Sequence, residues 1–404
     1  MASAAADTLE ALAEMLTKAA KALRSGSLSL ETDIFQRMGL IQAGTDLINA
    51  VSLPKDKTRL WFPQLAHFTA IRMFIKWRAF EKIPVGDGAA ISYTDLAAKL
   101  GGDVSLITRF ARVLVANGSL KQVGGDSVAH TELSQFLSTE NPFWAMVQVG
   151  FDNQVIPWAA MPRYFDQFGI STEPTDRLQT IVAFAEGRLG ATVWDINHST
   201  EERLRVFMLG MAFIDEHMPP LGVYDLGWAA KEAAKESDRV LVVDVGGGRG
   251  QALKGILKVT PWLPAHRCVL EDLPEVVEAA KRGNPELADV QMVVVDFFKE
   301  QPVRGALVYY IRGCLQDYSD EDCVRLLQQI SGAMAADSRL LIVETLLGDQ
   351  PSALQAALDL AMMAISGKQR TLDNFRDITG KAALEITKVC QIPNGSAVIE
   401  CAPA

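Results

Sequence analysis

The sequence predicts an α/β protein in two parts: a helical domain over residues 1–135, and residues 136–404 built around a doubly wound parallel sheet. Two observations carry this prediction. Apolar residues recur at helical spacing in the first part, whereas short buried strands alternate with amphipathic helices from residue 238 onward. Such alternation is typical of parallel strands joined by helices that cover both faces of the sheet.

Composition narrows the class of protein. The 404 residues are 49% hydrophobic and 22% charged, which is ordinary for a globular chain long enough for two domains. The formal net charge of -10 disfavours nucleic acid and anionic membrane surfaces as partners. The 5 cysteines form no C-x-x-C pair, so we expect no metal site and no disulfide framework. No signal peptide or membrane span is evident, and we expect a cytoplasmic protein.

The N-terminal domain contains one unit with a known layout. A helix capped by Ser92 or Thr94 is followed by a second helix over 104–116 and by two short strands that turn at a glycine pair. This is the arrangement of a winged helix. The second helix carries only Arg109 and Arg112 as basic residues, so a structural or dimerisation role is favoured over DNA binding.

Residues 140–235 are predicted to be helical and carry many large apolar side chains, among them Trp144, Phe151, Trp194 and Phe207. Plain core packing explains such residues. The lining of an apolar substrate pocket explains them as well. Both interpretations are open from the sequence.

The second part reads as a regular alternation of elements. Strands are predicted at 239–248, 266–274, 290–298, 305–314, 338–347 and 395–404, and helices at 250–259, 275–283 and 320–334. These segments define a Rossmann-like domain.

Three glycines mark a ligand-binding turn between the first strand and its helix. Gly246, Gly248 and Gly250 allow positive φ and close approach of the backbone to a ligand. Asp244, inside the strand, can hold this loop or reach the amino-acid part of a ligand. The pattern alone is weak, because dinucleotide-binding enzymes use a similar one.

Acidic residues at the next two strand ends sharpen the prediction. Asp272 follows the second strand, where a carboxylate can accept hydrogen bonds from ribose hydroxyls. Asp296 and Phe297 end the third strand and suit the edge and face of an adenine ring. A nicotinamide-dependent enzyme would not need this third strand end, so we expect a different adenosine-containing cofactor.

The motifs "DVGGGRG", "EDLPEVV", "VDFF", "YYIRGCLQDYSDEDC", "IVETLL" and "GKQRT" together resemble those of plant and fungal small-molecule O-methyltransferases. The resemblance covers nearly the whole chain. It implies S-adenosylmethionine bound by the glycine loop, with Asp272 at the ribose and Asp296–Phe297 at the adenine. It also implies that Arg312 lies near the cofactor and that the N-terminal helices form a homodimer.

The resemblance fails at the catalytic base. In that family a histidine deprotonates the acceptor hydroxyl, flanked by two glutamates. The histidine position is Gln316 here, the first glutamate is Glu344, and the second is Gln369; Asp317 is retained. General-base catalysis is worth about 10²–10⁴-fold. Without the histidine no imidazolium forms, and a buried carboxylate at position 369 would only cost desolvation energy. The change of the histidine to glutamine therefore accounts for the change of the second glutamate.

No other histidine is expected to replace the base. His67, His130, His198, His217 and His266 are all predicted to lie away from the strand ends of the second domain, and His130 and His198 are the least improbable candidates.

The sequence therefore favours a protein that binds S-adenosylmethionine without transferring its methyl group. It resembles fungal pericyclases of secondary metabolism, which would act on a natural-product intermediate such as a polyketide-type conjugated carbonyl. A positioned amide at Gln316 could polarise such a carbonyl. The alternatives are an O-methyltransferase whose acceptor is acidic enough to ionise unaided, and a cofactor-binding protein without chemistry.

Overall fold

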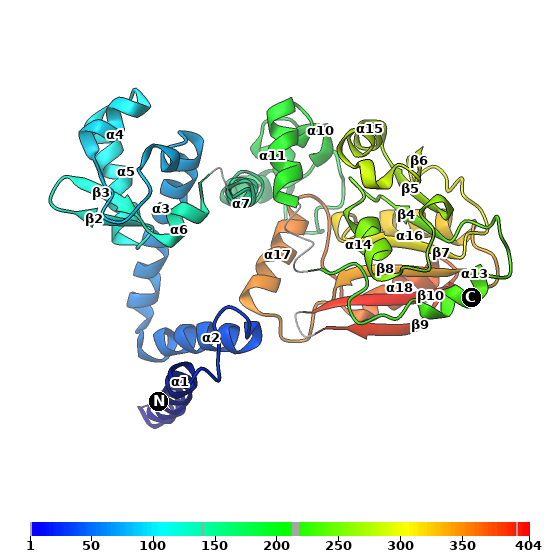
Figure 1. Ribbon diagram of the computed structural model, residues 1–404, viewed down its shortest axis with the longest axis horizontal. Helices are drawn as coiled ribbons and strands as arrows, with labels where there is room; N and C mark the ends of the chain where they lie inside the picture. The colour runs from blue at the N-terminus through cyan, green and yellow to red at the C-terminus, as the bar shows by residue number, and fades with distance from the viewer. Residues whose placement is uncertain (1, 139–140, 212–217, 393–394) are drawn as a thin grey trace. The chain divides into compact units, whose positions relative to one another are not determined.

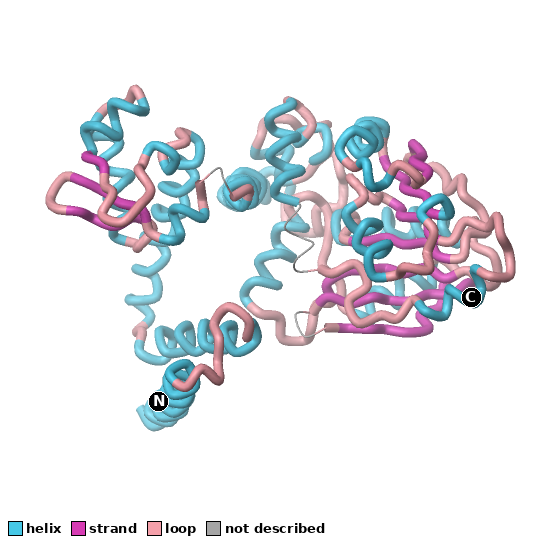
Figure 2. The backbone as a smooth tube through the Cα atoms, viewed as in Figure 1, coloured by secondary structure: helices cyan, strands magenta, loops and turns pink. Residues whose placement is uncertain are grey.

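A computed structural model describes residues 2–138, 141–211, 218–392 and 395–404. The chain divides into two compact units, Met1–Gln135 and Phe136–Ala404 (Figure 1). Figure 2 shows the difference in content: helices dominate the first unit, whereas the second contains a large sheet.

The first unit is mainly helical, and its elements are α1 (Ala2–Arg24), α2 (Ile34–Val51), α3 (Pro54–Lys76), η1 (Phe80–Lys82), β1 (Ile91–Ser92), α4 (Tyr93–Leu100), α5 (Val104–Ala116), β2 (Leu120–Val123), β3 (Ser127–His130) and α6 (Glu132–Phe136). The Ser92 hydroxyl accepts the Asp95 N–H and caps α4, while Asp103 caps α5 through the Leu106 N–H. The three strands form an antiparallel sheet in the order β1-β3-β2.

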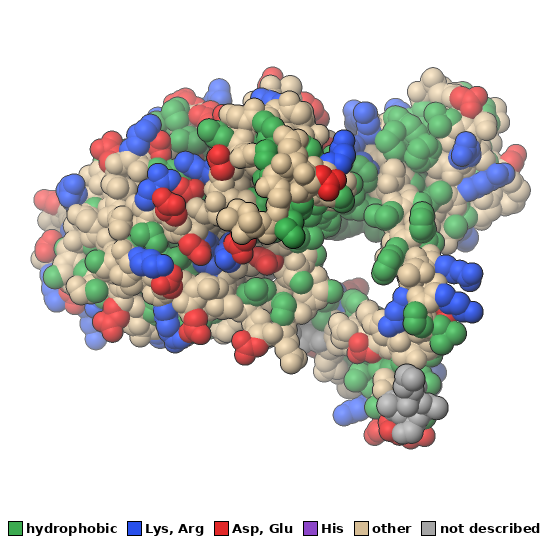
Figure 3. Space-filling view, turned by 180° about the vertical axis from the view of Figure 1, so that it is seen from behind, with side chains coloured by type: hydrophobic (Ala, Val, Ile, Leu, Met, Phe, Trp, Pro, Cys, Tyr) green, Lys and Arg blue, Asp and Glu red, His purple; other side chains and the backbone are tan. Residues whose placement is uncertain are grey.

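Helices α1 to α3 expose many large apolar side chains. Phe62 is 81% exposed and Trp61 is 61% exposed. Figure 3 shows hydrophobic side chains on the surface of this unit. Other exposed members of the set are Leu9, Met15, Leu16, Leu23, Met38, Ile41, Leu47, Ile48, Leu60 and Leu65. An apolar surface of this kind is unusual for a free monomer.

The second unit begins with helices that precede the sheet: α7 (Phe143–Gly150), η2 (Phe151–Val155), α8 (Ile156–Phe168), α9 (Ile181–Ala185), α10 (Val193–Asn197), α11 (Glu201–Met211) and α13 (Gly227–Ala233). Tyr164, Ile181 and Ile196 from three of these helices are buried in one cluster. Phe165 and Phe168 pack at its edge, so part of the large apolar set is core.

The strands are β4 (Val242–Val245), β5 (Cys268–Asp272), β6 (Gln291–Val294), β7 (Val308–Arg312), β8 (Arg339–Thr345), β9 (Leu384–Gln391) and β10 (Ser396–Pro403). They form one sheet in the order β6-β5-β4-β7-β8-β10-β9. The first five strands in this order are parallel, as predicted, whereas β10 is antiparallel to both β8 and β9. The predicted parallel sheet is therefore present, with an antiparallel edge that the sequence did not indicate. Strand β9 was not among the predicted strands.

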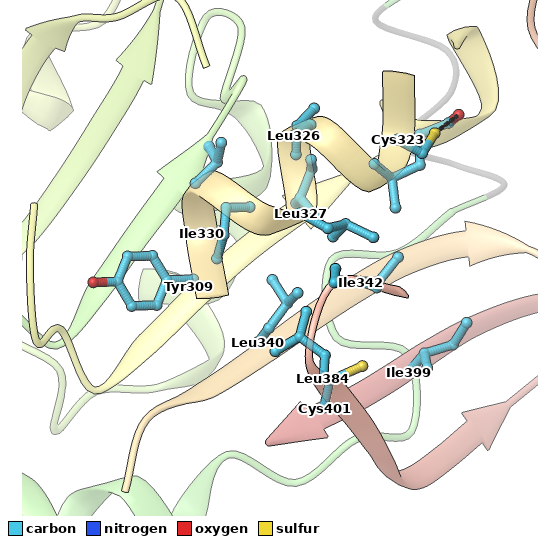
Figure 4. Close-up of a cluster of buried hydrophobic side chains, with 14 of the residues drawn as sticks. Tyr309, Cys323, Leu326, Leu327, Ile330, Leu340, Ile342, Leu384, Ile399 and Cys401 are labelled. Atoms are coloured by element: carbon cyan, nitrogen blue, oxygen red, sulfur yellow. Dashed lines mark hydrogen bonds between the residues drawn. The ribbon is translucent and has the colours of Figure 1, made fainter. Parts of the chain in front are cut away.

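The remaining helices are α14 (Gln251–Val259), α15 (Pro274–Gly283), α16 (Asp320–Ser331), α17 (Ala353–Met363) and α18 (Leu372–Lys381), with short turns η3 (Ala265–Arg267), η4 (Pro285–Leu287) and η5 (Leu315–Asp317). Apolar residues of α16 and α18 pack on one face of the sheet, and those of α13 and α14 on the other. Figure 4 shows the first of these clusters, in which Leu327 and Ile330 of α16 lie between the helix and Leu340 of β8. This is the predicted doubly wound, Rossmann-like arrangement.

Within the ranges described above, no helix combines the length and apolar character that crossing a bilayer requires. The same ranges contain no group of three or more His, Cys, Asp or Glu side chains placed to hold a metal ion.

Candidate cofactor and catalytic site

The glycine loop joins β4 to α14 at the carboxyl end of the parallel strands. Gly246, Gly248 and Gly250 all have positive φ, at +66°, +58° and +83°. A side chain at Gly250 would overlap Leu287, whereas a Cβ at Gly248 would meet only the Gln251 side chain at 3.8 Å. The Gly248 backbone therefore faces open space that a ligand can enter.

Asp244 and Asp272 hold this loop from two sides. The Asp244 carboxyl is buried beneath it, because a Cβ at Gly247 would lie 2.7 Å from Asp244 Oδ2. Asp272 Oδ2 accepts the Gly248 N–H at 2.8 Å, and Oδ1 accepts the Leu273 N–H at 2.7 Å. Burial raises the pKa of Asp272, and these two N–H groups oppose that shift. Each carboxylate oxygen retains a lone pair for a further donor.

Phe297 and Cys314 close the other side of the loop. A Cβ at Gly246 would lie 3.3 Å from the Phe297 ring and 3.5 Å from Cys314 Sγ. The Phe297 ring packs edge-on against Tyr318, with centroids 5.9 Å apart. These residues form an apolar wall beside the loop, as the sequence predicts for an adenine-binding residue at Phe297.

Asp296 and Arg312 make contacts outside this wall. Asp296 is 36% exposed at its side chain and pairs with Lys299 at 3.0 Å. Arg312 Nη1 donates to the carbonyl oxygen of Met218 at 2.8 Å. Their assignment to the adenine and to the cofactor's surroundings remains a prediction.

The turn η5 carries Gln316 and Asp317 directly after β7. Glu344 Oε1, from the end of β8, accepts the backbone N–H groups of Cys314, Leu315 and Gln316 at 2.9, 2.8 and 3.4 Å. Glu344 therefore fixes this turn. Its other oxygen, Oε2, is buried and has no hydrogen-bond partner among the residues that the structure describes.

Burial raises the pKa of Glu344 to about 7, although Arg370 and the three N–H groups oppose the shift. Burial, and secondarily the charge of Glu344, also raises the pKa of Asp317 well above its usual range. The site therefore carries less negative charge near neutral pH than its residue types suggest.

Gln316 and Gln369 are joined through their side chains. Gln369 Nε2 donates to Gln316 Oε1 at 2.7 Å, and Gln316 Nε2 lies 3.5 Å from the Gly313 carbonyl oxygen. Only an NH₂ group is attracted to a carbonyl oxygen, which sets the orientation of the Gln316 amide. Asp359 accepts the Gln369 backbone N–H at 2.9 Å and steadies the pair from α17.

Arg370, which sequence reasoning passed over, binds the same turn. Its guanidinium is fully buried and donates to the carbonyl oxygens of Leu315 and Tyr318 at 2.7 and 2.8 Å. It also donates to Asp320 at 2.8 Å. The neighbouring Gly367 lies so close that a Cβ there would overlap the backbone carbonyl oxygen of Gln316. The sequence indicates a role for Arg370 only through its position in the "GKQRT" motif, next to Gln369.

Two of the five histidines lie in the first unit. His67 and His130, in the first unit, contact Ser119 and Ser134 at 2.6 and 2.8 Å. His266 is exposed before β5, and His217 lies outside the described residues. No hydrogen bond joins any of the described histidines to Gln316.

His198 contradicts the expectation that all histidines lie away from the strand ends of the second domain. Its Nδ1 lies 3.3 Å from Glu275 Oε1, in the first turn of α15 directly after β5. Glu275 lies three residues after Asp272, so the contact brings His198 into the neighbourhood of that carboxyl. The sequence could not show this, because 74 residues separate His198 from Asp272 and only the fold brings them together.

A cavity of about 520 Å³ in the second unit borders the turn η5 through Asp320 and Gly367. Charged residues of both signs line it, including Glu173, Arg177, Asp320, Arg325 and Lys368. Neither Gln316 nor the glycine loop contributes to its wall.

Comparisons with known proteins identify similar sequences and similar folds. Residues 184–385 match the family model of the O-methyltransferase domain. Methyltransferase cfoD of Aspergillus candidus is 35% identical, and the alignment covers 99% of this chain and 100% of that protein.

Two solved structures share the fold. OxaC in complex with SAH and oxaline gives a TM-score of 0.86 at 21% identity, covering 98% of this chain and 100% of that one. A structure described as a pericyclic reaction enzyme gives a TM-score of 0.79 at 22% identity, covering 96% and 100%.

Proposed function

The chain belongs to the O-methyltransferase family, and from that premise we propose that it methylates an acidic small molecule that reaches the site already ionised. S-adenosylmethionine is the cofactor. The full-length similarity to a named methyltransferase supports methyl transfer over the pericyclic reaction that the sequence favoured. The pericyclic neighbour, at 22% identity, supports only the fold.

The residues around the glycine loop fit this cofactor. Asp272 has lone pairs left for ribose hydroxyls, Gly248 leaves space for the ligand, and Phe297 offers an apolar face beside Gly246. When bound, the cofactor supplies an activated methyl group on a cationic sulfur. Asp244 would hold the loop rather than touch the ligand, because it is buried beneath Gly247.

The orientation of Gln316 carries the proposal. Its carbonyl oxygen accepts a hydrogen bond from Gln369, and its NH₂ group, which directs one N–H to the Gly313 carbonyl oxygen, has a second N–H for an acceptor. A neutral amide removes no proton but donates a hydrogen bond to an oxyanion. The acceptor must therefore lose its proton before it binds, as an acidic enol or hydroxypyridone does near neutral pH.

The electrostatics of the site are compatible with an anionic acceptor. The raised pKa values of Glu344 and Asp317 lower the negative charge near Gln316. Full ionisation of both groups would repel an anion at close range. Asp317, Glu344, Gln316 and Gln369 thus form the catalytic set in this proposal, with Glu344 holding the turn and Gln369 orienting the amide.

A pericyclase that retains the methyl group is the second candidate. The same NH₂ group can donate to a conjugated carbonyl and stabilise developing negative charge on its oxygen, which is worth about 10²–10³-fold for one donor. The cofactor would then remain bound unchanged.

The first unit is proposed to form a homodimer, with residues 91–130 as a winged-helix module. The exposed apolar side chains of α1 to α3 support this, because a second copy would remove them from water. We place the protein in the cytoplasm, with no nucleic acid or membrane partner, on its negative charge and its reduced cysteines.

The test supplies 4-hydroxy-2-pyridones that carry a conjugated side chain, with S-adenosylmethionine, and measures products by mass spectrometry. We expect a product heavier by one methyl group and an equal amount of S-adenosylhomocysteine. A product isomeric with its substrate or differing by loss of water, with no S-adenosylhomocysteine, would favour the second candidate.

A further inference from the structure

Helix α10 has a side-chain contact near each end, and each contact leads toward the glycine loop. Near its start, Trp194 Nε1 donates to the Tyr318 hydroxyl at 3.2 Å. At its C-cap, His198 pairs with Glu275 at 3.3 Å. Trp194 and His198 are four residues apart, so both lie on one face of the helix.

Each attachment continues to the loop through one more residue. Tyr318 packs against Phe297, which lies beside Gly246. Glu275 follows Asp272 by three residues, and Asp272 accepts the Gly248 N–H. Trp194 and His198 therefore connect α10, through one further residue each, to the Phe297 side and to the Asp272 side of the loop.

His198 keeps one ring nitrogen for a ligand. Only Nδ1 has a partner among the described residues, namely Glu275, and the side chain is 18% exposed. An imidazole whose Nδ1 is held by a carboxylate presents Nε2 in a fixed direction. A partly buried nitrogen beside the ribose-binding carboxylate is suited to a ribose hydroxyl.

We propose that α10 closes over the bound cofactor and that His198 is a further cofactor-binding residue, which contacts a ribose hydroxyl together with Asp272. This inference rests on the cofactor assigned above but not on the fate of its methyl group. Glu275 acts through His198 and is a positioning residue.

The experiment measures binding of S-adenosylhomocysteine and of its 2′,3′-dideoxy analogue by calorimetry. It uses the full-length parent, His198→Ala, Glu275→Gln and the control His266→Ala. His266 is the same residue type, exposed at the opposite end of β5. Thermal unfolding of each variant checks that the fold is retained.

We expect His198→Ala to weaken binding of S-adenosylhomocysteine roughly two- to tenfold, the value of one hydrogen bond, and Glu275→Gln to weaken it less. His266→Ala should bind like the parent. The dideoxy analogue should bind the parent and His198→Ala equally, because it lacks the hydroxyls that His198 would contact.

Equal binding of S-adenosylhomocysteine by the parent and His198→Ala would overturn the inference, as would an equal loss for both ligands. A parent that binds neither ligand would overturn the cofactor assignment itself, and this inference with it.

Discussion

Replacing Arg370 with methionine should destabilise the second unit and loosen the turn that carries Gln316. The guanidinium is fully buried and joins the carbonyl oxygens of Leu315 and Tyr318. Methionine fills a similar volume but donates no hydrogen bond. The substitution therefore isolates the contribution of the hydrogen bonds from that of packing.

The magnitude follows from the contacts that are lost. Each hydrogen bond from a charged group is worth about 1.5–3 kcal/mol, so the two buried carbonyl contacts account for about 3–6 kcal/mol. The contact with Asp320 adds less than about 1 kcal/mol, because that side chain is 42% exposed. A unit of this size loses about 2–4 °C in Tm per kcal/mol, so we expect a decrease of about 10 °C.

Thermal unfolding followed by circular dichroism measures this loss, with Arg376→Met as the matched control. Arg376 lies six residues further along the chain in α18, is 60% exposed and pairs only with the exposed Asp373. The control should change stability by less than about 0.5 kcal/mol. An Arg370→Met protein that unfolds within 2 °C of the control, roughly the value of 1 kcal/mol, would refute the anchoring role.

Three further predictions concern the site. The folded-state pKa of Glu344 lies above its unfolded value, so its contribution to stability is present below about pH 4.5 and is lost as pH rises through about 7. The substitution Glu344→Gln removes this titration. Urea unfolding should therefore show a stability difference between pH 5 and pH 8 that is smaller by roughly 2 kcal/mol. Gly248→Val should abolish binding of S-adenosylmethionine in calorimetry, because valine is strained at φ +58° and fills the open space, whereas Gly125→Ala, in open space without positive φ, should bind normally. Gln316→Ala should slow turnover by about 10²–10³-fold, and Gln316→Glu should slow it by more, because a carboxylate offers no donor and repels an anionic acceptor. The control Gln328→Ala, at an exposed position, should have no effect. Equal rates for all three variants would exclude Gln316 from the chemistry.

Local pattern was sufficient for the elements of the Rossmann-like domain. The glycine loop lies between a strand and a helix, and Asp272 follows the next strand, as the alternation of strands and helices predicted. The antiparallel edge was harder to foresee. β9 reads "LEITKVCQ", and its alternating polar residues reflect an exposed edge strand rather than the buried apolar run of a parallel strand.

The residues of the site were predictable where a recognised motif contains them, whereas most of their contacts were not. The Gln316–Gln369 pair followed from matching two motifs, and the structure places these side chains in contact. The binding of three N–H groups by Glu344 could not be predicted, because it depends on backbone orientation at the end of β7. Contacts of Arg370 and His198 with distant segments depend on tertiary packing, which leaves no periodic signal in the sequence.

The central claim is that this site transfers a methyl group to an acceptor that is already ionised. The most direct measurement counts S-adenosylhomocysteine against product during turnover of a conjugated 4-hydroxy-2-pyridone, at pH values on both sides of the acceptor's pKa. The account predicts a one-to-one ratio at each pH, and a rate that rises through the pKa of the acceptor. Product formation without S-adenosylhomocysteine would contradict it.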